Sequence, residues 1–128
     1  MKAAPVLLAV LGLFFSLSGK AKEAPLRFPL PDQTEVTGQA EPPLEQRKLS
    51  QLTLNWPSST TWKLKAFDAL MPTHKHGMIV QPSQPIQVGA HSYRFDGVKL
   101  HMPGTWILRL QIEDANGKQQ WVEVPRVL

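Results

Sequence analysis

The chain contains no cysteine among its 128 residues. Neither a disulfide framework nor a thiolate metal site can therefore form. No segment of helical length shows a 3.6-residue period of apolar side chains, which argues against a helical fold. Lysine and arginine are scattered, and no nucleic-acid-binding motif accompanies the formal net charge of +4. The basic residues are those of a mildly basic, solvated surface.

Catalytic motifs are also absent from the sequence. The serines lie in no nucleophile motif, and the carboxylates are too dispersed to flank a reacting bond. No glycine-rich loop could cradle a phosphate group. We therefore expect that the protein is not an enzyme.

The N-terminus predicts export. Lys2 precedes an apolar stretch at 3–15, which is shorter than the roughly 20 residues that span a bilayer. Small residues follow it, as a signal peptidase prefers. We interpret residues 1–19 as a signal peptide, with an uncleaved N-terminal anchor as the alternative. The protein is therefore expected to be periplasmic or otherwise exported.

Residues 20–45 combine several prolines with polar side chains, a composition typical of an extended, partly disordered linker. A short apolar patch at 26–30 interrupts this stretch. It could dock on the domain as a strand edge or bind a partner. The folded domain is expected to occupy residues 46–128.

From Gln46 onward, apolar and polar residues alternate with the period of two that marks half-buried strands. The longest such run is 105–113, with Trp106, Leu108, Leu110 and Ile112 on one face. The pair Asn116-Gly117 follows it and predicts a hairpin turn into a last strand at 119–124, with Pro125 tolerable only at an edge or beyond the strand end. Shorter runs lie at 51–56, 62–66, 85–88 and 92–95. Six or seven strands at this spacing predict an all-β fold, an antiparallel β-sandwich.

Histidine and methionine are concentrated in two short segments. Met71 and Met78 bracket the His74-Lys75-His76 triplet, and Met102 directly follows His101. Imidazole and thioether ligands together suit copper, and sulfur favours Cu(I). We expect a copper site with Trp106 packed beneath it. Its core ligands would be His74, His76 and Met78, with Met71, Met102 and His101 available to complete it.

Geometry limits this hypothesis. In a straight strand His74 and Met78 would lie roughly 13 Å apart, too far for one ion. Either a bend at Pro72 and Gly77 brings the donors together, or some of them pair with the segment around His101. The alternative is that the methionines are core residues flanking a turn and the histidines are solvent-facing. His91 stands apart and is expected to be an exposed turn residue.

Three motifs resemble the YtkA-like domain family, which is akin to the FixH-like proteins linked to copper delivery and respiratory oxidase assembly. They are Met71-Pro72 with its His-Gly turn, the Gly89–Phe95 segment with its tyrosine, and Met102-Pro103-Gly104-Thr105-Trp106. The resemblance covers about residues 46–126. It implies an immunoglobulin-like β-sandwich, export or membrane anchoring, and a link to copper. Members commonly carry methionine where this chain has His74, and imidazole there would shift preference toward Cu(II).

The sequence therefore predicts an exported copper-binding or copper-delivery domain that serves a copper-accepting exported or membrane protein. The alternative is an accessory sandwich, without metal, that binds another exported protein. That reading requires an exposed apolar edge, for example at 86–88 or 26–28. The copper reading requires His74, His76 and Met102 to lie in one neighbourhood.

Overall fold

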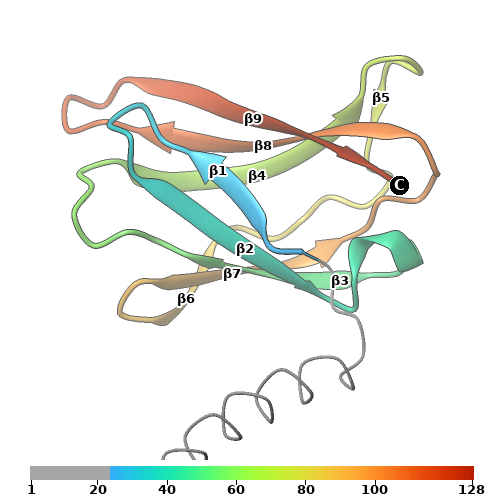
Figure 1. The fold of residues 1–128 in the computed structure, drawn as a ribbon, viewed down its shortest axis with the longest axis horizontal. Helices are drawn as coiled ribbons and strands as arrows, with labels where there is room; N and C mark the ends of the chain where they lie inside the picture. Colours follow the sequence, from blue (N-terminus) through green and yellow to red (C-terminus); the bar gives the residue numbers. More distant parts are fainter. Residues whose placement is uncertain (1–23) are drawn as a thin grey trace, which may run out of the picture.

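Two antiparallel sheets packed face to face make up the fold (Figure 1). The computed structural model describes residues 24–128, so the predicted signal peptide lies outside the described part of the chain. One sheet has the order β1 (Leu26–Pro29), β2 (Glu35–Glu41), β3 (Ser50–Asn55), β7 (Ser92–Val98) and β6 (Ile86–Gly89). The other has the order β5 (His76–Gly77), β4 (Lys63–Met71), β8 (Thr105–Glu113) and β9 (Gln119–Val127).

The prediction of an all-β antiparallel sandwich is confirmed, with nine strands in residues 24–128 instead of about seven. A short 3-10 turn, η1 (Leu44–Gln46), connects β2 to β3. Within this range no helix is both long and apolar enough to cross a membrane.

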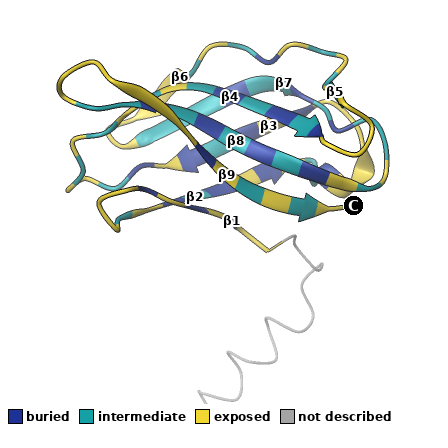
Figure 2. Cartoon of the chain, turned by 90° about the horizontal axis from the view of Figure 1, so that it is seen from above, coloured by how far each residue is buried: buried dark blue, intermediate teal, exposed yellow. Residues whose placement is uncertain are grey.

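The core lies between the two sheets, where Figure 2 shows the buried positions alternating along the strands. The predicted inward face of β8 is completely buried at Trp106, Leu108, Leu110 and Ile112. Phe67 of β4 meets Phe95 of β7 across the sandwich, with ring centroids 5.8 Å apart. Because the chain has no cysteine, such contacts between the inner faces hold the two sheets together without a disulfide.

The predicted linker is wrong for most of its length. Residues 26–29 and 35–41 form β1 and β2, which extend the first sheet beyond β3. Leu26 and Phe28 point into the core and are 6% and 0% exposed, so they are not available to a partner. Pro29 is compatible with β1 because this is an edge strand, where an absent N–H breaks no ladder. The folded domain therefore begins near Leu26.

The remaining strand predictions hold. The predicted run 105–113 coincides with β8, and the Asn-Gly hairpin forms with Gly117 at φ +85°. Asp114 donates its N–H to the Lys118 carbonyl at 2.9 Å to close that turn. Pro125 falls within β9, which is an edge strand of its sheet, as the sequence requires.

Because β1 belongs to the core, Phe28→Ala should destabilise the domain strongly. Loss of a fully buried phenylalanine costs about 3–5 kcal/mol. Arg27→Ala is the matched control, since Arg27 makes only an exposed ion pair with Glu35, worth at most about 1 kcal/mol. Urea unfolding followed by tryptophan fluorescence measures both. Equal, small losses would show that β1 does not contribute to the core.

Candidate functional site

The predicted His/Met residues gather at one end of the sandwich, where β4 ends and β8 begins. After Met71 the chain makes a tight turn, in which the N–H of Lys75 donates to the Met71 carbonyl at 2.8 Å. The two-residue strand β5 then pairs back on β4, with His76 opposite Met71. The predicted bend therefore exists. The bend is the turn at 72–75, where Lys75 has a positive φ. Gly77, which the sequence suggested as a bend position, has no positive φ.

Three of the four histidines form a row at this end. The rings of His74 and His76 are 5.7 Å apart between centroids, and those of His76 and His101 are 5.4 Å apart. Both pairs are close to parallel, at 30° and 31°. His74 is exposed, whereas His76 and His101 are half-buried. The row therefore forms by both routes that the sequence left open, the bend and the contribution of His101 from a distant segment.

Trp106 lies beneath this row, as expected. Its indole meets the rings of His76 and His101 edge to face, with centroids 6.2 Å and 5.6 Å away. Its Nε1–H donates to the Met102 carbonyl at 2.9 Å, which fixes the loop that carries His101 and Met102. The floor of the histidine row is therefore rigid and apolar.

The methionines differ in their surroundings. Met78 and Met102 are half-buried and pack against the edge of the core. Met71 is 1% exposed and is a core residue, which matches the alternative interpretation for this side chain. Its methyl group lies under Gly104, where an added Cβ would come within 2.6 Å of Met71 Cε. Gly104 also exchanges both backbone hydrogen bonds with Leu128, at 2.9 Å and 3.3 Å.

Two ring nitrogens of the histidine row differ in their surroundings. The pKa of His101 is lowered, chiefly by desolvation and then by repulsion from His76 and Lys99. Its buried Nδ1 has no hydrogen-bond partner among the described residues. His76 Nδ1 lies 3.1 Å from the Gly77 carbonyl. A carbonyl can only accept, so this contact puts the proton on Nδ1 and leaves the Nε2 lone pair available to a ligand.

The row is not a closed coordination shell. In residues 24–128, no group of three or more His, Cys, Asp or Glu side chains is arranged to hold a metal ion. A copper site here would need a thioether ligand, rotation of the histidine rings, or both, because each bond is only about 2 Å long. His74 stands in an exposed turn, and a groove of about 400 Å³ reaches His76 from solvent. Both features give such a rearrangement room.

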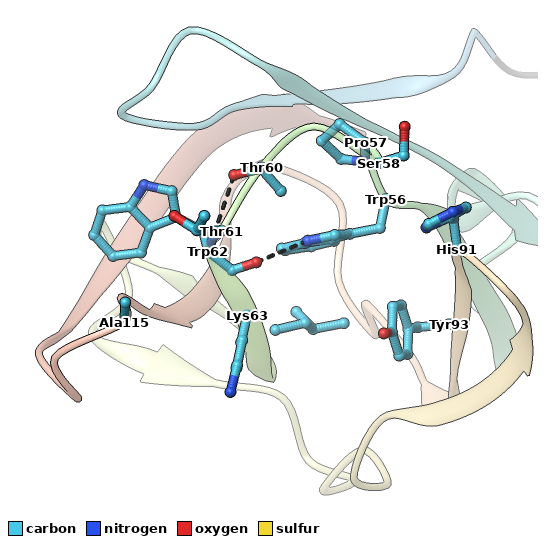
Figure 3. Close-up of a pocket in the computed structure, with 11 residues that line it drawn as sticks. Trp56, Pro57, Ser58, Thr60, Thr61, Trp62, Lys63, His91, Tyr93 and Ala115 are labelled. Carbon is cyan, nitrogen blue, oxygen red and sulfur yellow. Dashed lines mark hydrogen bonds between the residues drawn. The ribbon is translucent and has the colours of Figure 1, made fainter.

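His91 lies away from this row, at the other end of the sandwich. It is exposed in the turn between β6 and β7, as predicted. There it lines a second cleft, which sequence reasoning missed (Figure 3). The sequence did contain a sign of this cleft, because three aromatic residues lie at or beside strand ends: Trp56, Trp62 and Tyr93.

Comparisons with known proteins found no matching family model, no matching curated protein and no matching solved structure. The resemblance to YtkA-like domains stays a prediction that rests on the three motifs.

Gly104→Ala should destabilise the domain by about 2–4 kcal/mol, because the new Cβ would meet Met71 and because φ is +131° there. Gly89→Ala is the control, since its Cβ would make ordinary contacts at 3.4 Å. Urea midpoints of the two variants give the comparison. A Gly104→Ala midpoint no lower than that of Gly89→Ala would contradict the close packing of this loop on Met71.

Proposed function

We propose that this protein is an exported copper-binding domain that holds the ion at the His/Met end of the sandwich and passes it to a copper-accepting protein. The observation that carries the proposal is the row of His74, His76 and His101, drawn from two segments that lie far apart in the sequence. The row places three imidazole rings next to one another, with neighbouring centroids 5.7 Å and 5.4 Å apart.

The ligands differ in role. His101 and His76 are the anchoring ligands, because one has an unpartnered buried nitrogen and the other has a lone pair fixed by its contact with Gly77. Met102 and Met78 are the thioether candidates, since both stand half-buried at the rim. Met71 is the weakest candidate because its position in the core limits its movement.

Delivery is favoured by the asymmetry of the site. One side rests on the fixed Trp106 indole, and the other is the exposed turn that carries His74. An acceptor could approach from the solvent side and replace the ligands of the turn one at a time. His101 and His76 would keep the ion in place until the transfer is complete.

Competition titration with a chromophoric chelator tests this proposal for Cu(I) and Cu(II) separately. We expect stoichiometric binding tighter than about micromolar, weakened at least about tenfold in His76→Ala and in His101→Ala. His91→Ala is the matched control and should bind as the unaltered protein does. The pKa of His101 is lowered, chiefly by desolvation, so proton competition at this ligand should weaken binding only below the ordinary imidazole pKa of about 6.5.

Two results would contradict copper binding at this site. One is an affinity no tighter than micromolar for either oxidation state. The other is a loss in His91→Ala equal to that in His76→Ala, which would indicate adventitious binding by surface histidines. Circular dichroism of each variant separates loss of the ligand from loss of the fold.

A second candidate function, docking of another protein, is favoured by β6. This edge strand contains no charged residue, and its Ile86 and Val88 are 37% and 46% exposed. Such an edge can accept an extended segment as an added strand.

For β6 docking, an Ile86→Lys/Val88→Lys variant should lose capture of an exported partner from extract. Val127→Lys is the control, because Val127 is an exposed apolar residue of a different edge strand. Unchanged capture by the β6 variant would contradict this function. The copper affinity of both variants should stay the same.

A further inference from the structure

A cleft of about 690 Å³ lies at the opposite end of β4 from the His/Met row. Figure 3 shows its residues around the central ring of Trp56, with Trp62 and Tyr93 on opposite sides. Three of the chain's five tryptophan and tyrosine residues are therefore in one cleft. The full lining is Trp56, Pro57, Ser58, Thr60, Thr61, Trp62, Lys63, Leu64, His91, Tyr93 and Ala115.

Hydrogen bonds hold this cleft in shape. Trp56 donates its backbone N–H to the His91 carbonyl at 2.7 Å and its indole N–H to the Trp62 carbonyl at 3.0 Å. Thr60 Oγ1 accepts from the Trp62 N–H at 3.2 Å and donates to Asp32 Oδ2 at 2.5 Å. The loop between β3 and β4 is thus tied to two neighbouring loops. A ligand would meet a preformed site and would not have to order it.

The walls offer both ring faces and hydroxyl groups. Trp56 and Tyr93 pack edge to face with centroids 6.2 Å apart, and Trp62 is half-buried beside them. The hydroxyls of Ser58, Thr61 and Tyr93 have no hydrogen-bond partner among the described residues. Apolar surface with a few placed polar groups is typical of a small-molecule site. A ligand that suits this surface has C–H faces to lie on the rings and many hydroxyls.

The lining of the cleft includes the ammonium of Lys63, and no carboxylate is among its lining residues in the described part of the chain. Asp32, which lies next to the lining residue Thr60, already accepts hydrogen bonds from Thr60 and Thr34. Glu113, opposite Lys63 in the β4–β8 ladder, is already engaged with Lys65 at 3.3 Å and with Gln119. After the hydrogen bonds from Gln119 and Lys65, Lys63 also helps to lower the pKa of Glu113 through its charge but forms no ion pair with it, so its ammonium can still pair with an anionic ligand.

We propose that this cleft binds an acidic saccharide. The sugar ring lies against Tyr93 and Trp62, the hydroxyls of Ser58 and Thr61 bond to its hydroxyls, and Lys63 pairs with its carboxylate. A proline-rich peptide fits less well. It could use the same rings and hydroxyls, but a peptide of uncharged residues gives the Lys63 ammonium no anionic partner.

Binding of short oligogalacturonates, beside uncharged maltooligosaccharides of equal length, tests the proposal. Two-dimensional amide NMR of the full chain should show oligogalacturonate shifts at 56–63, His91 and Tyr93, and none at His74 or His76. Lys63→Gln should weaken binding at least about fivefold, the order expected for loss of one charged contact. Lys48→Gln is the matched control, because Lys48 is exposed, lies outside the cleft and is not in contact with Glu113.

Three results would overturn the proposal: no shifts with either saccharide, equal weakening by both lysine variants, or tighter binding of an oligoproline peptide than of oligogalacturonate. Lys63 is exposed, so Lys63→Gln should keep the thermal midpoint of the unaltered protein and report on binding alone.

Tyr93→Phe adds a second test, since it removes only the hydroxyl and should weaken binding without unfolding the domain. His76→Ala should leave the saccharide affinity unchanged, which makes this site independent of copper.

Discussion

The burial of Trp106 is the interaction on which most of the structure depends. Its side chain is completely excluded from water at the first inward position of β8. Covering on the order of 200 Å² of aromatic surface contributes about 5 kcal/mol at 25 cal/mol per Å². Its polar atom is satisfied by the Met102 carbonyl, so burial leaves no unpaired donor. The same ring is the floor for His76 and His101. Core stability and site geometry therefore share one side chain.

Strand β4 links the two ends of the molecule. At its Met71 end lies the histidine row, and at its Lys63 end lies the aromatic cleft. The pairing of β4 with β8 runs from Lys63–Glu113 to Leu70–Ile107, so one ladder spans both. The two ends nevertheless carry different chemistry. Thioether and imidazole groups lie at one end, and aromatic rings, hydroxyls and the Lys63 ammonium lie at the other. The two proposed sites therefore share no side chain, and each can be altered by mutation without the other.

The sequence predicted those parts of the fold in which a local rule decides the outcome. The period of two placed β8 and its buried face correctly, and Asn116-Gly117 placed the hairpin. The linker prediction failed at 26–41, because proline content outweighed the alternation of Leu26 and Phe28. The alternative that the apolar patch at 26–30 docks on the domain as a strand edge is confirmed by β1. Strand β2 was also hard to see, since its inward positions include Gly38, where a Cβ would come within 2.7 Å of Leu54.

The members of the histidine row were all named from the sequence, but their arrangement was not. That His101 lies next to His76 depends on how β8 pairs with β4 and on the turn at 72–75, and neither follows from local pattern. The second cleft was missed for a related reason. Its residues come from loops and strand ends, where no periodicity marks which side chains will meet.

The mutual hydrogen bonds of Gly104 and Leu128 have a practical consequence for handling the protein. They hold the last residue of the chain against the loop that carries Met102 and directly precedes Trp106. An oligohistidine purification tag fused after Leu128 would start beside the histidine row and supply extra imidazoles to any ion bound there. Affinities measured with that tag in place would report on a composite site. With a tag that is cleaved off, or one without histidine, the measured affinity is that of the protein's own side chains.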